Sequence, residues 1–153
     1  MYFAAVLLLL FVLPTASVLA EKLVFQSAAG WMPLVGRWFV FWAVGVRLFM
    51  AGVMQVARPD FTSQRIFEIK DPTVFGIVRE VGFGNLAMGT IGLASLIYTG
   101  WVVPAAVAGG LYYGLAGVGH HVRGGGNFLE RTAMISDYLI FALLAAFVAW
   151  SLL

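Results

Sequence analysis

The stretch Arg79-Glu80-Val81-Gly82-Phe83-Gly84-Asn85 places a cation, an acid, an amide and two glycines where the chain enters an apolar segment. In a membrane helix, charged and amide side chains are costly unless they face protein or water. Glycines on one helix face let a second backbone approach closely, and an amide there can add an interhelical hydrogen bond. The stretch therefore predicts a membrane helix that packs tightly against its neighbours.

The composition of the whole chain is that of a membrane protein. Of its 153 residues, 62% are hydrophobic and only 10% are charged, whereas a typical soluble domain carries about 25% charged residues. Several apolar runs reach or approach the roughly 17 to 25 residues that a helix needs to cross a bilayer. We therefore predict an all-α fold, a polytopic transmembrane helical bundle of four core spans plus a retained N-terminal transmembrane helix.

Three segments follow along the chain. Residues 1–20 form the N-terminal transmembrane helix; this run resembles a secretory signal peptide, but no Lys or Arg precedes it, so we expect it to be retained. Residues 21–37 are expected to be an extracytoplasmic connector at the membrane surface. Residues 38–153 form the four-helix membrane domain, in which residues 61–70 fit a short interfacial helix.

The basic residues of the loops predict an orientation. With five spans, one side of the membrane carries Arg58, Arg65, Lys70, Arg79, Arg123 and Arg131, and the other carries Lys22 and Arg37. Because cytoplasmic loops hold the excess of Lys and Arg, we expect the N-terminus in the cytoplasm and the C-terminus outside.

Polar side chains from different spans are predicted to meet in one layer near the cytoplasmic ends of their helices. This predicted cluster consists of Arg47, Gln55, Glu80, Asn85, His120, His121 and Asp137. Helical spacing puts His121 on a small-residue face, so we expect it to face protein with His120 beside it. Three interpretations stay open. The first is structural: Arg47 pairs with Glu80 or Asp137, and the histidines cap the end of their helix. The second is a proton, ion or quinone site, and the third a histidine ligand for haem or a chlorophyll-type pigment.

Two faces of small residues predict close helix packing. The first consists of Gly82, Gly89 and Gly92 on the helix that Asn85 shares, and the second of Ala106, Gly110, Gly114 and Gly117. Gly110 and Gly114 form a GxxxG pair. The last helix also carries Ala142, Ala145, Ala146 and Ala149, which offer a further close-packing face.

Several functions are excluded by what the chain lacks. It has no cysteine, so disulfides, thiolate catalysis and Cys-ligated zinc or iron–sulfur clusters are absent. No nucleophile motif, phosphate-binding loop or metal-ligand spacing occurs, and no basic patch points to nucleic acid. The sequence therefore indicates no catalytic residue and no metal site, and it requires no cofactor. His120 and His121 are weak candidates for binding a cofactor.

Two stretches resemble the DoxX-like superfamily of small bacterial membrane proteins and a neighbouring group of four-helix membrane proteins. Residues 47–55 are similar to the Arg, Gly and Lys or Gln pattern of that family's first helix, and residues 80–92 to the acid and glycines that open its second. The resemblance covers about residues 38–150 and implies a four-helix bundle in the bacterial inner membrane. It also implies membership of a membrane complex, which in some relatives passes electrons to the quinone pool.

The small size of the chain, its small-residue faces and its lack of catalytic motifs favour a small accessory or scaffolding subunit of a larger membrane complex. An electron-transfer complex is one possibility. Its partners would be the lipid bilayer and other membrane proteins, including further copies of itself. The alternative is a small transporter or a module that binds a proton, an ion or a quinone through the polar cluster on the cytoplasmic side.

Overall fold

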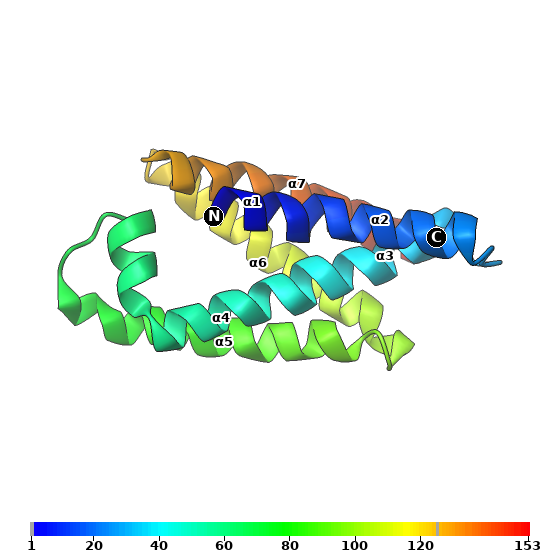
Figure 1. The fold of residues 1–153 in the computed structure, drawn as a ribbon, viewed down its shortest axis with the longest axis horizontal. Helices are drawn as coiled ribbons and strands as arrows, with labels where there is room; N and C mark the ends of the chain where they lie inside the picture. Colours follow the sequence, from blue (N-terminus) through cyan, green and yellow to red (C-terminus); the bar gives the residue numbers. More distant parts are fainter. Residues whose placement is uncertain (1, 125) are drawn as a thin grey trace.

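The computed structural model describes residues 2–124 and 126–153, and helices make up nearly all of this part, which contains no strand (Figure 1). Two long rods come first, each made of α-helical and π-helical turns in succession. The first rod comprises α1 (Tyr2–Leu7), η1 (Leu8–Val12), α2 (Leu13–Leu19) and η2 (Ala20–Val24), and the second α3 (Trp31–Phe39), η3 (Val40–Arg47) and α4 (Leu48–Ala57). The remaining elements are η4 (Phe61–Ile66), η5 (Pro72–Val74), α5 (Phe75–Ala94), η6 (Thr99–Trp101), α6 (Val102–Val122) and α7 (Phe128–Ser151).

Four helices of the described residues are long and apolar enough to cross a membrane. Their bounds are Tyr2–Val24, Trp31–Ala57, Thr99–Val122 and Phe128–Ser151. The predicted helical membrane bundle is thereby confirmed. α5 runs alongside the second rod (Figure 1) but does not belong to these four, because Arg79, Glu80 and Asn85 lower the hydropathy of a 20-residue helix.

The second rod and α5 meet through glycines, as the first small-residue face predicts. A Cβ on Gly52 would lie 2.7 Å from the Gly82 carbonyl oxygen, and a Cβ on Gly89 would lie 2.6 Å from the Phe49 nitrogen. Gly92 approaches Gly45 equally closely. The two backbones are in direct contact along this seam, which leaves no room for side chains between them.

The second small-residue face lies between α6 and α7. The rings of Phe141 and Tyr138 pack against Gly114 and Gly117, where an added Cβ would approach ring atoms to 2.9 and 3.1 Å. Ala106 is 1% exposed, and Gly110 lies in ordinary contact with Leu144. The four alanines of α7 are different: Ala142, Ala145, Ala146 and Ala149 are exposed, so the small-residue face predicted for this helix lies on the outside of the bundle. α7 uses its larger side chains inward, because the glycines of α6 leave room for them.

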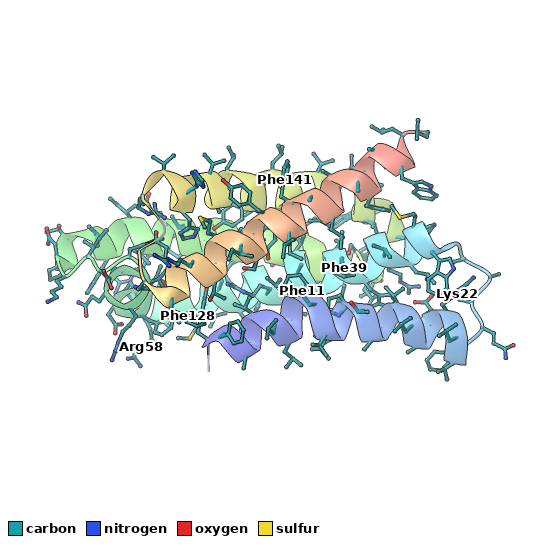
Figure 2. The ribbon with its side chains drawn as sticks, turned by 90° about the horizontal axis from the view of Figure 1, so that it is seen from above. Phe11, Lys22, Phe39, Arg58, Phe128 and Phe141 are labelled. Carbon is teal, nitrogen blue, oxygen red and sulfur yellow. The ribbon has the colours of Figure 1, made fainter. Side chains whose placement is uncertain are left out.

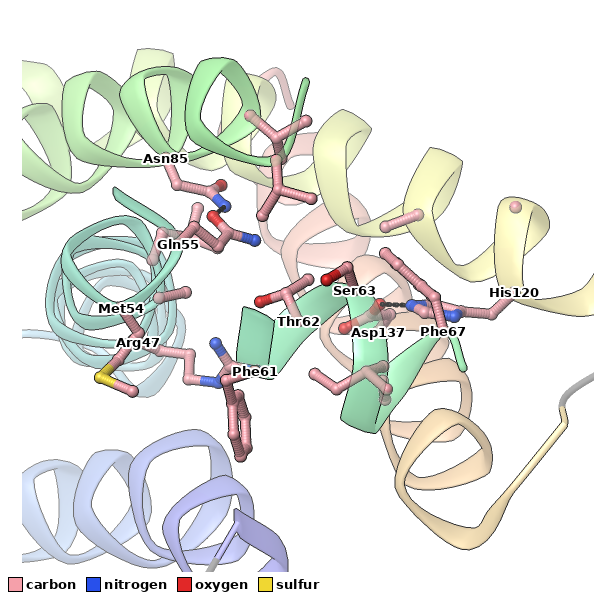
Figure 3. Close-up of a pocket in the computed structure, with 18 of the residues that line it drawn as sticks. Arg47, Met54, Gln55, Phe61, Thr62, Ser63, Phe67, Asn85, His120 and Asp137 are labelled. Atoms are coloured by element: carbon pink, nitrogen blue, oxygen red, sulfur yellow. Dashed lines mark hydrogen bonds and ion pairs between the residues drawn. The ribbon is translucent and has the colours of Figure 1, made fainter. Parts of the chain in front are cut away.

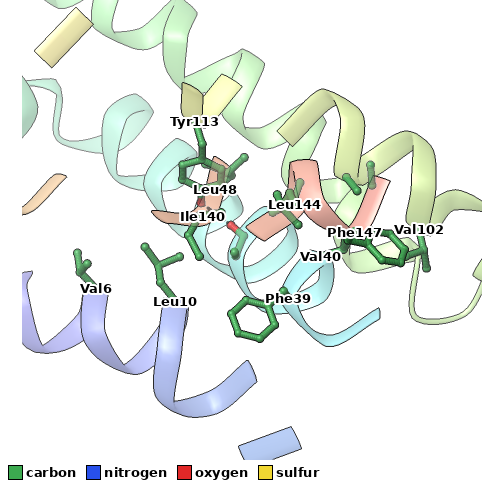
Figure 4. Close-up of a cluster of buried hydrophobic side chains, with 14 residues drawn as sticks. Val6, Leu10, Phe39, Val40, Leu48, Val102, Tyr113, Ile140, Leu144 and Phe147 are labelled. Carbon is green, nitrogen blue, oxygen red and sulfur yellow. Dashed lines mark hydrogen bonds between the residues drawn. The ribbon is translucent and has the colours of Figure 1, made fainter. Parts of the chain in front are cut away.

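The first rod belongs to the hydrophobic core. Val6 and Leu10 pack with Val40, Ile140 and Leu144, and all five are at most 2% exposed (Figure 4). Burying large aliphatic side chains is the main favourable term in such packing. The N-terminal helix is therefore as much part of the bundle as the later spans.

The connector predicted over residues 21–37 is helical at both of its ends. The first rod continues to Val24 and the second begins at Trp31, which leaves residues 25–30 as the link. Glu21 joins the ends of the two rods, because its carboxylate accepts hydrogen bonds from Arg37 Nη1 over 3.0 Å and from Trp38 Nε1 over 2.7 Å. Lys22 Nζ donates to the Ser27 and Ala29 carbonyls. The ion pair of Glu21 and Arg37 neutralises two charges at this end of the bundle, and the carbonyls satisfy the Lys22 ammonium group.

The remaining loops gather at two opposite ends of the molecule. The N-terminal end of the first rod, the 58–74 segment, and residues 123–124 and 126–127 lie at one end, which we call the loop end; Arg58 and Phe128 mark it in Figure 2. Lys22 and the C-terminus lie at the other end (Figures 1 and 2). The pair α4 and α5 and the pair α6 and α7 diverge toward the loop end, and residues 58–67 cross the gap between them (Figure 1).

Asp71 caps the turn that leads into α5. Its Oδ1 accepts a hydrogen bond from the Thr73 backbone N–H over 2.9 Å, and this bond holds the pKa of the Asp71 carboxyl below its usual value. A lowered pKa means that the cap is fully formed above the ordinary pKa of Asp and is lost as pH falls through the lowered one. We expect Asp71→Ala to lower the hydrogen-exchange protection factors of Thr73 and Val74 at neutral pH, and acid to lower the same protection factors in the unchanged protein. Equal protection factors in both proteins at neutral pH would contradict this role.

Candidate functional site

A cavity of about 750 Å³ lies between the diverging helix pairs at the loop end (Figure 3). Most of its lining is apolar. Five of the seven residues of the predicted polar cluster border it, and they come from the second rod, α5, α6 and α7: Arg47, Gln55, Asn85, His120 and Asp137. Largely apolar walls with a few convergent polar groups are typical of sites for small molecules.

The segment after α4 forms one wall of the cavity. η4 lies across the loop end between the helix pairs, and its Thr62, Ser63 and Ile66 are buried against the bundle. Ser63 is 0% exposed, and its Oγ donates to the Pro59 carbonyl over 3.1 Å. Asn127 Nδ2 donates to the Arg65 and Ile66 carbonyls over 3.2 Å, which ties the segment to the start of α7. Satisfied polar groups let this short segment lie inside the bundle.

Arg47 lies deep in the cavity with few partners of its own. Its Nη2 donates to the Tyr2 hydroxyl over 3.4 Å, and its guanidinium lies 5.9 Å from the centre of the Tyr2 ring. Within residues 2–124 and 126–153, no carboxylate lies within 4.0 Å of it. The predicted structural pairing with Glu80 or Asp137 is therefore absent as a direct ion pair, and the guanidinium keeps donors available toward the cavity.

Asn85 faces the cavity from α5. Its side chain is 1% exposed, and Nδ2 donates to Gln55 Oε1 over 2.7 Å. Its Oδ1 has no hydrogen-bond partner in the described chain, although the Tyr112 side chain comes near the amide. A buried acceptor without a partner costs roughly 1 to 3 kcal/mol. Asn85 thus offers an acceptor in the same cavity that the donors of Arg47 face.

His120 lies between two carboxylates at the loop end of the cavity. Its Nδ1 is 3.2 Å from Glu130 Oε1, and its Nε2 is 3.8 Å from Asp137 Oδ2. Arg123 Nε donates to Glu130 Oε1 over 3.0 Å, and its Nη2 lies 3.1 Å from His120 Nδ1. The Phe67 ring covers this cluster, with its centre 4.4 Å from the Arg123 guanidinium carbon and 5.7 Å from the His120 ring.

The structure does not bring Glu80 and His121 into the cluster. Both side chains are exposed on the outside of their helices, and neither borders the cavity. The expectation that His121 faces protein is wrong, because His121 faces outward and it is His120 that is buried, with 7% exposed. Adjacent residues point about 100° apart on a helix, so only one can face the cavity, and the carboxylates of α7 favour His120.

Sequence reasoning missed the contributions of Tyr2, Phe67, Arg123 and Glu130. Their contacts join residues that are distant in sequence, such as Tyr2 and Arg47, which no local spacing relates. Glu130 carried a partial signal because it lies three residues after the helix cap Asn127, whose Oδ1 accepts from the Leu129 and Glu130 backbone N–H groups. The carboxylate itself turns to His120 and Arg123.

A bound haem or pigment would need a free imidazole nitrogen. Both nitrogens of His120 already face charged side chains, and the described residues contain no group of three or more His, Asp or Glu that could hold a metal ion. Ligation by His120 would therefore require these contacts to break. His121 lies on the outer face, and the other histidine of the chain, His120, points about 100° away from it.

Fold and cavity together define a class: an α-helical membrane bundle with a polar-lined cavity among its helices. Within that class, the chain belongs to the DUF6790 family, a family of unknown function whose sequence pattern matches residues 1–153. No curated protein and no solved structure matches the chain.

Proposed function

We propose that this protein is an intramembrane binding module, and that the cavity takes a lipid-soluble molecule with an apolar body and a polar head that both donates and accepts hydrogen bonds. The observation that carries this proposal is the pairing of two polar groups without adequate partners in one largely apolar cavity. Arg47 has donors to spare, and Asn85 Oδ1 lacks a partner among residues 2–124 and 126–153. Hydrogen bonds from a ligand would offset the cost of burying both groups.

The route by which a ligand reaches the site supports a lipid-soluble one. Ile77 of α5 and Leu115 of α6 both border the cavity, yet they are 66% and 72% exposed. The cavity therefore reaches the apolar outer surface of the bundle. In a bilayer that surface contacts acyl chains, so a molecule dissolved in the membrane can enter without crossing water.

The test is photolabelling of the purified protein in lipid nanodiscs with a monoacylglycerol that carries a diazirine in its acyl chain. This probe has hydroxyls that donate and accept, as the site requires. We expect mass spectrometry to place the label on peptides of α5, α6 and η4, and excess unlabelled monoacylglycerol to compete. Label spread evenly over the outward faces of all helices would overturn the proposal.

A pair of variants on α5 makes this test specific. Asn85→Leu removes the unpaired acceptor and should lower labelling at least about fivefold, near the effect of one lost hydrogen bond of roughly 1 kcal/mol. Glu80→Leu on the exposed face of the same helix is the matched control and should not change it. Equal labelling of both variants and the unchanged protein would contradict a site at Asn85.

The accessory-subunit role is the second candidate, and one observation favours it. Ala142, Ala145, Ala146 and Ala149 form an exposed small-residue stripe on α7, of the kind that lets another membrane helix approach closely. The occupant would be another membrane protein or a second copy of this chain. If Ala145→Leu disrupts a complex that Asn85→Leu leaves intact, the protein has this role as well; if neither variant affects labelling or assembly, both candidates fail.

The proposal places the protein in a bacterial inner membrane, with its loop end and N-terminus in the cytoplasm. The six basic residues of the loop end support this orientation. The chain has no cysteine, so single cysteines can report on it. In intact spheroplasts we expect a membrane-impermeant maleimide to modify Ala28→Cys and to modify Gln64→Cys only after permeabilisation. The reverse pattern would invert the topology.

A further inference from the structure

We propose that Glu130, His120 and Asp137 form a proton relay that connects the cavity with the aqueous phase at the loop end. The three side chains lie in a row across α6 and α7, with His120 between the two carboxylates. Asp137 borders the cavity, whereas Glu130 lies in the first turn of α7 and bonds to Arg123, whose side chain is 47% exposed. The row therefore starts near water and ends inside the bundle.

The surroundings of Nδ1 suit both protonation states of that nitrogen. When Nδ1 carries a proton it can donate to Glu130 Oε1 at 3.2 Å, and when it is bare it can accept from Arg123 Nη2 at 3.1 Å. A histidine with a purely structural role needs a partner for one state only. Here neither state leaves Nδ1 unsatisfied, so a proton can come and go at this nitrogen without the penalty for an unpaired polar group.

The total number of protons is conserved at each step of the transfer. A proton passes from the Glu130 carboxyl to His120 Nδ1, which makes the imidazolium, and the imidazolium then releases its other proton from Nε2 to Asp137 Oδ2. The 3.8 Å between Nε2 and Oδ2 exceeds hydrogen-bond length, so this step needs a closer approach of about 1 Å or one bridging water. The relay resets when the ring turns over, which restores the starting tautomer. Transfer in the reverse direction begins with a proton from the Asp137 carboxyl to Nε2 and ends with the Nδ1 proton passing to Glu130.

The charged and titratable groups around the relay come from every element that packs there. Arg123, Tyr112 and Tyr113 are on α6, and Glu130 and Asp137 are on α7. Arg47 and Tyr2 face Asp137 across the cavity from the second and first rods. Phe67 shields the His120 ring from the side of η4. Because no ligand takes part in the transfer, the relay can be tested whether or not the proposed binding site exists.

Nitrogen-15 NMR of histidine-labelled protein in nanodiscs tests the two states of His120 directly. The chain has only two histidines, so His121→Gln, on the exposed face, leaves His120 as the single signal. We expect exchange between protonated and bare Nδ1 between about pH 5 and 8, and Glu130→Gln should shift the population toward bare Nδ1. One fixed tautomer over this whole range, unaffected by Glu130→Gln, would overturn the relay.

Infrared spectroscopy after a pH jump tests delivery to the cavity. The carbonyl band of the protonated Asp137 carboxyl, assigned by its loss in Asp137→Asn, should appear at least about tenfold more slowly in His120→Gln than in the His121→Gln control, because removing a general acid–base group typically costs a factor of 10² or more. Glu130→Gln keeps the imidazole and serves as the second variant if His120→Gln does not fold. Equal rates in the folded variants and the control would refute the relay.

Discussion

Gly92→Ala is expected to destabilise the bundle by about 2 to 3 kcal/mol, the upper part of the range for overpacking a tight contact. A Cβ at this position would collide with the Gly45 backbone and would lie 2.8 Å from the Val44 carbonyl carbon. Backbone atoms cannot swing aside as a flexible side chain can. The second rod and α5 would have to separate along the seam that holds them together.

Gly84→Ala is the matched control for this prediction. Gly84 is on the same helix, but a Cβ there meets nothing within 4 Å. Because alanine is the better helix former by up to about 1 kcal/mol, this variant should be neutral or slightly stabilising. Reversible unfolding in mixed detergent, followed by the fluorescence of the five tryptophans, measures both free energies of unfolding. Equal destabilisation by the two substitutions would show that the seam is not the cause.

Arg47→Met is expected to lower photolabelling by the monoacylglycerol probe about tenfold, equivalent to roughly 1.4 kcal/mol, while stability stays the same or increases. Arg47 forms one long hydrogen bond to Tyr2 and has no carboxylate within 4.0 Å in the described chain. A central arginine costs about 2.5 to 3.5 kcal/mol on insertion scales. Methionine of similar length removes this cost together with the donors that a ligand would use.

Arg79→Met controls for the loss of a positive charge at the same end of the molecule. Arg79 is exposed and does not border the cavity, so labelling should stay unchanged. The two readouts together separate the competing interpretations of Arg47. If Arg47→Met instead lost more than about 2 kcal/mol of unfolding free energy and labelling per folded molecule stayed constant, Arg47 would have a structural role and the binding proposal would fail.

Helical packing could be predicted well from local patterns, because glycine spacing on one helix already states which face can accept a neighbour. Gly82, Gly89 and Gly92 all lie in the predicted contact. The alanines of α7 show the limit of that reasoning. A small-residue face permits close packing but does not select the partner, and here the larger Ile140 and Leu144 face inward instead.

The candidate site was only partly predictable for a similar reason. Asn85, Arg47 and Asp137 could be placed inside because lipid is a poor solvent for them, and the structure puts all three around one cavity. The prediction that Glu80 belongs to the polar cluster is wrong, because this residue lies near the end of a helix, where an exposed carboxylate can reach water. The DoxX-like resemblance stays a prediction, since membership of the DUF6790 family neither supports nor excludes it.

By itself, the sequence determined that the chain folds as apolar helices in a membrane and that most of its few ionic groups inside the spans turn away from lipid, since the cost of exposing charge to hydrocarbon acts on each residue separately. Only the tertiary structure decided that His120 rather than His121 faces Asp137 and Glu130, that Tyr2 reaches Arg47, and that η4 folds inward to form a wall of the cavity. These contacts depend on how helices distant in sequence are rotated and spaced against each other, and that arrangement is set by the packing of the whole bundle.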